Sequence, residues 1–256
     1  MKISVLISAY KAEKYLAEAI TSVIRQTRRR KLEIDLIVVS DGCVESWEIA
    51  KKHNTSGTNI LLKENSGVYR SFNTALELVD DDTDYITFNG ADDVWHPDRL
   101  SEVVSQSRGR VGLTAFSSYY KTINEDGKVT GSVGKHCPTG HFTYCKKVFD
   151  VLGGFKDWRC GADTEFLLRA RELGTVLFVS PRHLFYYRRH SEQLTQHPKT
   201  GKFSVARKDA QEYVRRMRKL PEDWMFGHVP RVTGAISEWD GLISETRLDK
   251  IKHLSC

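Results

Sequence analysis

Short runs of almost continuously apolar residues alternate with amphipathic stretches through the first part of the chain. The runs cover residues 3–8, 34–40, 60–63 and 85–88. Between the first two, apolar residues from Tyr15 to Ile24 recur at helical spacing. A strand that is apolar at nearly every position is buried on both faces, as in a parallel sheet covered by helices. The pattern therefore predicts βαβ units and an α/β fold.

The pattern becomes more mixed after residue 97. A helix is expected from Pro97 to Gln106, followed by a strand from Val111 to Ile123. Asp126-Gly127 is a hairpin signal, so a ribbon should return through residues 129–133. Two helices ended by glycine are expected at 142–152 and 163–173, and two strands at 176–179 and 183–188. The whole predicts a mixed, mostly parallel sheet flanked by helices.

Positive charge is concentrated in one C-terminal segment. The net charge is +6, yet residues 181–220 alone hold eleven Lys and Arg against three Asp and Glu. A basic helix is expected from Ser204 to Leu220, within a mainly helical extension over 191–256. Besides a solvated helix face, three partners remain open for the basic 181–220 segment: an anionic membrane surface, an acidic glycan acceptor or a nucleic acid.

Composition narrows the class of protein. With 256 residues, 40% of them hydrophobic and 28% charged, the chain suits a soluble protein with one sizeable core. Its five cysteines show no CxxC spacing, which argues against a zinc site or a disulfide framework. No run approaches the roughly 20 apolar residues that span a bilayer, and Met1–Tyr10 reads as a first strand, not a secretion signal. We expect a cytoplasmic protein, with peripheral attachment to a membrane left open.

Polar residues follow directly after several predicted strands. Asp41 and Asn65 come after the second and third, and the pair Asp92 and Asp93 after the fourth. Ligands of open α/β sheets bind at the carboxyl ends of the strands. Paired carboxylates there suit a divalent cation that carries a nucleotide diphosphate. The alternative is a solvated loop in which one of the two caps the following helix.

Several motifs occur in an order that is typical of one family. They are residues 3–10, 19–27 and 37–42, Asn65-Ser-Gly-Val68 with Asn73, Ala91-Asp-Asp93 followed by Pro97, Gly153-Gly-Phe155, and residues 161–170. In this order the chain resembles the family 2 inverting glycosyltransferases of the GT-A fold. The resemblance covers about residues 1–190. It implies a Rossmann-like nucleotide-diphospho-sugar transferase domain, with a nucleotide-binding half over about 1–98 and an acceptor half over about 99–190.

The resemblance also implies a nucleotide site. Asp41 is expected to accept a hydrogen bond from a uracil or thymine base, on which Tyr10 stacks. Ser8, Asn65 and Arg70 are expected to complete the site. The alternative for Asp41 is a turn-forming Asp-Gly pair.

A metal and diphosphate site is implied beside it. In the family's pattern, Asp93 binds Mn²⁺ or Mg²⁺ and Asp92 contacts the ribose. His190 is expected to complete the metal shell, and Arg188 and Arg189 to contact the diphosphate, since the arginine fork suits phosphate oxygens.

Asp163 matches the family's catalytic base, which deprotonates the acceptor hydroxyl. Glu165 is the reserve candidate, because Ala162 stands where the family usually has Glu. The alternative for both acids is a first-turn position favoured by the helix dipole. Two further departures are Ser40 and Gly90, at positions where the family often has Asp.

The resemblance therefore implies metal-dependent transfer of a sugar, with inversion, from a nucleoside diphosphate sugar, above all a UDP-sugar. The acceptor would be a hydroxyl of a glycan or lipid-linked saccharide. Two alternatives are a phage-type DNA glycosyltransferase acting on hydroxymethylated bases and a degenerate GT-A domain that only binds. A sugar nucleotidyltransferase is disfavoured, because residues 8–12 lack a glycine-rich phosphate loop.

Overall fold

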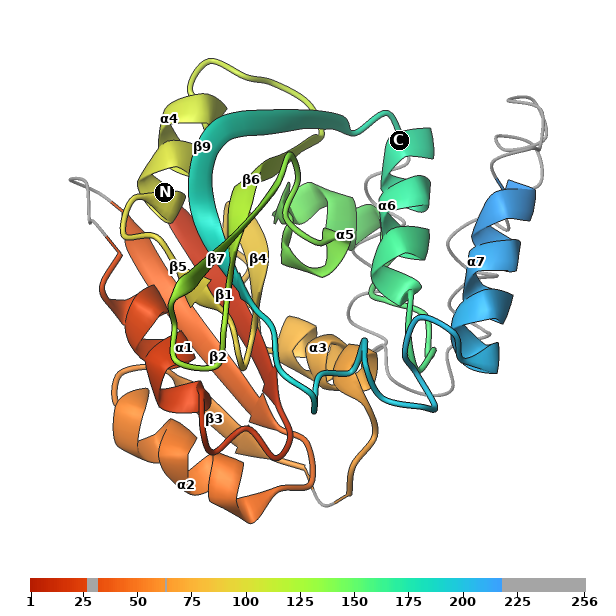
Figure 1. Ribbon diagram of the computed structural model, residues 1–256. Helices are drawn as coiled ribbons and strands as arrows, with labels where there is room; N and C mark the ends of the chain where they lie inside the picture. The colour runs from red at the N-terminus through yellow and green to blue at the C-terminus, as the bar shows by residue number, and fades with distance from the viewer. Residues whose placement is uncertain (27–31, 63, 218–256) are drawn as a thin grey trace.

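A computed structural model describes residues 1–26, 32–62 and 64–217. Within these ranges nine strands form one sheet (Figure 1). They are β1 (Lys2–Ala9), β2 (Glu33–Ser40), β3 (Thr58–Leu61), β4 (Tyr85–Gly90), β5 (Val94–Trp95), β6 (Thr114–Ile123), β7 (Val129–Gly134), β8 (Thr143–Cys145) and β9 (Val176–Arg188). Their order is β3-β2-β1-β4-β8-β6-β9-β5, with β7 paired to β6.

The sheet is parallel at one side and mixed at the other. β1 runs parallel to β2 and β4, β2 parallel to β3, and β6 parallel to β9, while the remaining pairs are antiparallel. The register places Ala9 opposite Ser40, and Ser8 opposite Gly90. The carboxyl ends of β1, β2 and β4 therefore lie side by side. The predicted α/β fold with a mixed sheet is confirmed.

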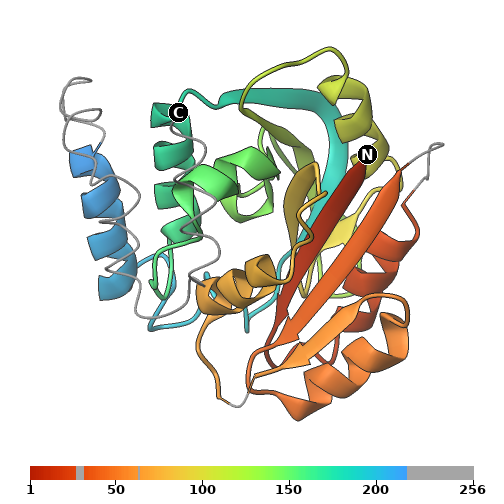
Figure 2. The ribbon, with the colours of Figure 1, turned by 180° about the vertical axis from the view of Figure 1, so that it is seen from behind.

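The helices cover both faces of this sheet (Figures 1 and 2). They are α1 (Leu16–Ile24), α2 (Val44–His53), α3 (Val68–Glu77), α4 (Arg99–Ser107), α5 (Lys146–Leu152), α6 (Ala162–Glu172), α7 (Val205–Met217) and the short 3-10 helix η1 (Thr139–His141). The chain steps from β1 to β2 to β3 in one direction and then returns to β4. Because crossovers between parallel strands are right-handed, this reversal puts α1 and α2 on one face and α3 on the other.

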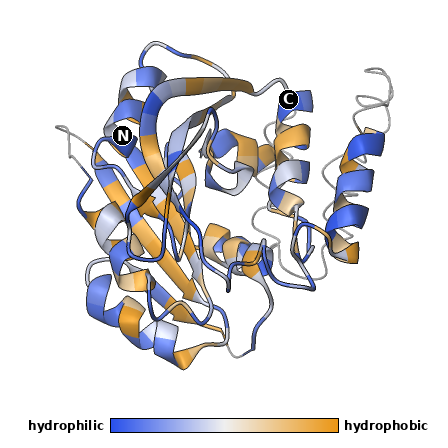
Figure 3. Cartoon of the chain, in the orientation of Figure 1, coloured by the Kyte–Doolittle hydropathy of each residue, from blue (hydrophilic) through white to orange (hydrophobic). Residues whose placement is uncertain are grey.

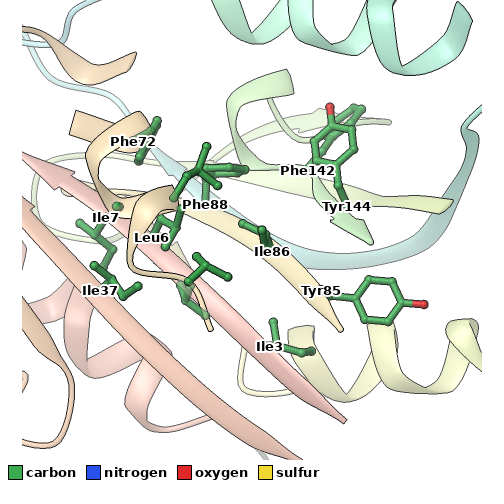
Figure 4. Packing of buried hydrophobic residues seen from close by; sticks show 14 of the residues in the cluster. Ile3, Leu6, Ile7, Ile37, Phe72, Tyr85, Ile86, Phe88, Phe142 and Tyr144 are labelled. Atoms are coloured by element: carbon green, nitrogen blue, oxygen red, sulfur yellow. The ribbon is translucent and has the colours of Figure 1, made fainter. Parts of the chain in front are cut away.

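Buried apolar side chains hold the layers together. Those of β1 and β4, such as Leu6 and Phe88, are fully buried between the helices (Figure 4). Hydropathy colouring shows the central strands as mostly hydrophobic (Figure 3). Aromatic rings from α3, β4, α5, α6 and the loop between α5 and α6 then form one cluster, with contacting ring centroids 4.5–6.0 Å apart: Phe72, Phe88, Phe149, Phe155 and Phe166. Such contacts add about 0.5–1.5 kcal/mol per pair beyond burial. They fix α6 against the sheet.

Two predicted elements are wrong in detail. The helix expected from residue 142 begins only at Lys146, because Thr143–Cys145 form strand β8 between β4 and β6. The two strands expected at 176–179 and 183–188 are one strand, β9. Ser118 pairs with Ser180 and Tyr119 with His183, so residues 181–182 form a bulge where the strand bends.

Other expectations hold. The predicted hairpin joins β6 to β7, with Gly127 at a φ of 79°. The basic helix is present as α7, while residues 218–220 of its expected range and the rest of the extension to 256 lie outside the described residues. Among the described residues, no helix is long and apolar enough to cross a bilayer. The four described cysteines are free and buried, namely Cys43, Cys137, Cys145 and Cys160.

Candidate active site

Asp92 and Asp93 follow the carboxyl end of β4 and lie beside the end of β9. Asp93 is only 1% exposed, and its Oδ1 accepts a 2.8 Å hydrogen bond from the backbone N–H of Arg188. Its Oδ2 lies 3.3 Å from Nε2 of His141. Asp92 is more open, and its Oδ2 lies 2.9 Å from Nε2 of His190. The structure thus pairs the expected Asp92 with the expected His190, and it pairs Asp93 with His141, which the sequence analysis missed.

The charge state of this cluster follows from its burial. Burial, and then the neighbouring charge of Asp92, raise the pKa of Asp93 well above its usual value. Burial, and then the charge of Arg99, lower the pKa of His141 to about 4, so its imidazole is neutral at pH 7. Carboxylate oxygens and imidazole nitrogens are ligand types that suit Mn²⁺ or Mg²⁺. The chemistry of these residues therefore suits a divalent cation, but they lie as two separate pairs, Asp93 with His141 and Asp92 with His190, and not as a group of three ligand atoms within 4.8 Å of one another.

Gly90 leaves room for these carboxylates. A Cβ at this position would lie 2.6 Å from Oδ2 of Asp93 and 2.7 Å from Oδ1 of Asp92. Both distances are far below a normal contact, so any side chain here displaces the pair. Glycine at position 90, where the family often has Asp, thus leaves the space that the carboxylates of Asp92 and Asp93 occupy.

Asp41 shapes the loop after β3. It is 1% exposed, and its carboxylate accepts hydrogen bonds from the side chain of Asn65 at 2.9 Å, from the N–H and hydroxyl of Ser66, and from the N–H of Gly67 at 2.8 Å. The backbone of Gly42 lies very close to that of Asn65, because a Cβ on Gly42 would lie 2.4 Å from the backbone nitrogen of Asn65. The structure brings Asp41 and Asn65 together as expected, but both carboxylate oxygens already have protein partners.

The other expected nucleotide residues lie along the same edge. Tyr10 follows β1 and is 48% exposed, with Nζ of Lys11 5.5 Å from its ring centroid. Ser8 is half-buried opposite Gly90 in the sheet. Arg70, on α3, forms an ion pair with Asp157.

Arg188 and Arg189, at the end of β9, lie in different environments. Arg188 is 1% exposed, and its guanidinium donates to the carbonyls of Asp92, Asn124 and Glu125 and to the carboxylate of Glu18, at 2.5–3.1 Å. It holds the segment of the paired carboxylates in place and has no free edge for a phosphate. Arg189 is exposed, with its guanidinium 4.6 Å from the ring centroid of Tyr187.

Asp163 lies in the first turn of α6, held from two sides. The hydroxyl of Tyr69 donates to its Oδ1 at 2.7 Å, and the hydroxyl of Thr139 donates to its Oδ2. The N–H of Gly161 donates to the Tyr69 hydroxyl in turn. Burial, and then the charge of Asp163, raise the pKa of Tyr69, so the phenol keeps its proton. Tyr69 directly follows the Asn65–Val68 motif, which was the one sequence signal for it.

Glu165, expected as the reserve base, lies in a different environment. It is 2% exposed, and its two oxygens accept hydrogen bonds of 2.8 and 2.9 Å from Arg169. Arg169 also donates to the carbonyls of Leu152 and Gly154. This buried pair ties α6 to the end of α5, and it leaves Asp163 as the carboxylate with access to the site.

The 3-10 helix η1 connects the two halves of the site. Its first residue, Thr139, contacts Asp163, and its last, His141, contacts Asp93. The backbone carbonyl of His141 accepts a 2.5 Å hydrogen bond from the buried Arg99. Three residues without any periodic pattern thus span from the candidate base to the candidate metal ligand.

A separate group of possible ligands lies at the start of α2. The thiol of Cys43 donates to Glu13 at 3.3 Å and to Glu45 at 3.4 Å, and the ligand atoms of all three lie within 4.8 Å of one another. Because the two carboxylates are exposed and share the thiol as a hydrogen-bond donor, their proximity needs no ion.

The chain was compared with known proteins. The family model Glycosyl transferase family 2 matches residues 4–213. An uncharacterized glycosyltransferase of Nostoc sp. is 27% identical over 216 residues, which cover 74% of this chain and 65% of that protein. The minor teichoic acid biosynthesis protein GgaA of Bacillus subtilis is 28% identical over 181 residues, covering 68% of this chain and 39% of that protein. The chain thus spans less than two thirds of each of these relatives.

Among solved structures, the chain is similar in fold to TarS of S. aureus. The crystal structure of TarS residues 1–349 in complex with UDP-GlcNAc superposes with a TM-score of 0.68 and 15% identity, covering 98% of this chain and 78% of that one. The complex of the same protein with UDP gives a TM-score of 0.61 and 17% identity, covering 98% and 83%. The GT-A fold expected from the sequence is confirmed.

Proposed function

This chain belongs to glycosyl transferase family 2, and we propose that it transfers a sugar from a UDP-sugar to a hydroxyl acceptor, with inversion and with the help of a divalent cation. One observation carries the proposal. A pair of carboxylates of a type suited to a cation and a separate, half-buried carboxylate at a helix start are bridged by η1. Such an arrangement can hold a diphosphate at one end and deprotonate a hydroxyl at the other.

The donor end is built from residues of β4 and β9. Asp93, Asp92 and His190 would hold Mn²⁺ or Mg²⁺, with Arg188 keeping their backbone in place. When bound, the cation would offset the charge that grows on the departing diphosphate. The exposed Tyr10 would stack on the base. The UDP-GlcNAc and UDP complexes of TarS support uracil as that base.

The acceptor end centres on Asp163. Its carboxylate takes the proton of the acceptor hydroxyl as that oxygen forms the new bond to the anomeric carbon. The bond from this carbon to the diphosphate breaks on the opposite side, and UDP leaves. Tyr69 and Thr139 orient the carboxylate, because each donates a hydrogen bond to a different oxygen. A single displacement of this kind inverts the configuration and needs no covalent enzyme intermediate.

We further propose a glycan or lipid-linked saccharide as acceptor. A relative named for minor teichoic acid biosynthesis supports a saccharide-containing polymer.

The donor site is tested first by calorimetric titration of UDP, GDP and dTDP, with Mn²⁺ and then with EDTA. We expect UDP to bind with Mn²⁺, to lose that binding in EDTA, and to bind Asp93→Ala in neither condition. Equal binding of UDP with Mn²⁺ and with EDTA would rule out the cation. Product from a UDP-α-sugar is then examined by NMR, and retention of the α configuration would rule out inversion.

A further inference from the structure

A pocket with a volume of about 470 Å³ lies between the segment after β9 and the first turns of α7. Its walls are polar and basic, with one aromatic side chain: Arg189, Thr195, Gln196, His197, Pro198, Gly201, Lys202, Phe203, Ser204, Arg207 and Gln211. The volume falls in the range of pockets that bind small molecules, about 300–1,000 Å³. None of the residues assigned to the cation or to the base lines it.

The charge of this pocket is not balanced. Arg189, Lys202 and Arg207 line it, and none of the described residues that line it is Asp or Glu. Among the ion pairs of the part of the chain that the structure describes, none involves these three residues. The Nε of Arg207 donates to the carbonyl of Thr200 at 2.8 Å, which fixes the guanidinium at the wall. A pocket with three cations and no carboxylate attracts an anion.

The pocket adjoins both ends of the candidate site. At one wall, Arg189 immediately precedes His190, which contacts Asp92. At the other, α7 packs on the start of α6, since a Cβ on Gly161 would lie 3.1 Å from the Cβ of Ala210. Gly161 is two residues before Asp163. An anion bound here would therefore lie next to the segments that carry His190 and Asp163.

The Cys160 thiol gives a second indication of this proximity. Burial raises its pKa, while the charge of Arg207 acts to lower it and the charge of Asp163 acts to raise it. Both charged groups thus lie within electrostatic reach of one buried sulfur, one from the pocket and one from the site.

We propose that this pocket binds a phosphate group of the acceptor, so that the acceptor is a phosphorylated saccharide; the proposal rests on the function proposed above. The arginine forks suit phosphate oxygens, and the lysine adds a point charge. Phe203 is 80% exposed and offers a flat apolar face to a sugar ring beside the phosphate. A pocket of this volume accommodates one phosphorylated sugar unit, whereas a nucleic acid duplex needs an extended basic surface.

The test uses glucose 6-phosphate as the probe and glucose as its uncharged counterpart. Each is titrated calorimetrically into the full chain, with saturating UDP and Mn²⁺ and again without them. We expect glucose 6-phosphate to bind in both conditions and glucose in neither. We expect Lys202→Gln to weaken this binding about fivefold, as one charge-assisted contact is lost, and Lys202→Gln/Arg207→Gln to weaken it further.

Lys208→Gln is the matched control, because Lys208 is exposed on α7, next to Arg207 in the sequence, and does not line the pocket. It should bind glucose 6-phosphate as the wild type does, and all variants should keep the wild-type affinity for UDP. Loss of glucose 6-phosphate binding when UDP and Mn²⁺ are present would assign the pocket to the donor diphosphate and overturn the proposal. Equal binding by wild type and Lys202→Gln would overturn it too.

A short DNA duplex is titrated in parallel. Binding of the duplex that weakens in Lys202→Gln, without binding of glucose 6-phosphate, would overturn the proposal in favour of nucleic acid. The two proposals fail separately: absence of UDP binding contradicts the glycosyltransferase donor site, while the titrations without UDP still report on the pocket.

Discussion

The Tyr69 hydroxyl donates a 2.7 Å hydrogen bond to the carboxylate of Asp163, although the two residues are 94 positions apart. Tyr69 belongs to α3 and Asp163 to α6. With the Thr139 hydroxyl on the other oxygen, the carboxylate is held from both sides. The orientation of the candidate base therefore depends on the packing of three separate elements.

Asp163→Asn is expected to abolish transfer and to spare donor binding. An amide cannot accept the acceptor's proton, and general-base catalysis contributes typically about 10²–10⁴-fold in rate. Sugar transfer and UDP titration with Mn²⁺ are measured on the same preparation. Asp209→Asn, on the exposed side of α7, is the control and should transfer at the wild-type rate. Wild-type transfer by Asp163→Asn would show that another residue is the base.

Tyr69→Phe is expected to lower kcat about tenfold with little change in KM for the donor. The variant removes the hydrogen bond, worth about 1–1.5 kcal/mol, that orients the base, together with the one that the hydroxyl accepts from the N–H of Gly161, and it leaves the ring in the core. Steady-state kinetics with varied donor give the two constants. Tyr213→Phe removes a phenol that accepts a hydrogen bond from Lys156, and serves as the control. A raised KM with unchanged kcat in Tyr69→Phe would place this tyrosine in donor binding instead.

Gly90→Ala is expected to weaken Mn²⁺-dependent UDP binding at least tenfold. The new methyl group would lie within 2.7 Å of both paired carboxylates, which must then move. Overpacking of this kind typically destabilises by about 1–3 kcal/mol, so circular dichroism checks that the variant is folded. Gly140→Ala is the control, because its nearest neighbour would be 3.5 Å away, an ordinary contact. Unchanged UDP affinity in Gly90→Ala would mean that the carboxylates do not bind the cation in this arrangement.

Arg188→Lys should destabilise the protein, whereas Arg189→Lys should not. The buried guanidinium of Arg188 satisfies three carbonyls and Glu18 at once, which an ammonium cannot reproduce. We expect a loss of about 2–4 kcal/mol in the free energy of unfolding for Arg188→Lys and less than about 0.5 kcal/mol for Arg189→Lys. Urea denaturation gives both values. Equal stability of the two variants would contradict a structural role for Arg188 and would favour the expected role as a diphosphate ligand.

Glu102→Gln is expected to remove a pH-dependent contribution to stability. Burial acts to raise the pKa of Glu102. Hydrogen bonds from Ser180, Arg182 and Gln106 outweigh it and lower this pKa below its ordinary value of 4.5. A depressed pKa stabilises the fold above the unfolded value and ceases to do so as pH falls through the folded value. The variant should lose about 1 kcal/mol at pH 7. The difference from wild type should shrink below about pH 4 in urea titrations, and a constant difference across this range would contradict the assignment.

Local pattern was enough to predict the parallel half of the sheet and the edge that carries the site. Strands such as Ile3–Ser8 are apolar at nearly every position, so their burial on two faces could be read directly, and the acids that follow them had to meet at one edge. The position of Asp163 at a helix start was predictable for the same reason, because the helix ended by Gly174 has a local signature.

Only the tertiary structure decided which of these residues touch. β8 is three residues long and exists because β4 and β6 offer it backbone partners on both sides. Thr139 and His141 have no pattern, yet they contact Asp163 and Asp93. Arg188 and Arg189 are adjacent and alike in sequence, yet one is buried at the paired carboxylates and the other lines the basic pocket. Periodicity reports the environment of a residue along its own element, whereas these contacts join segments distant in the chain and depend on how the whole sheet curves.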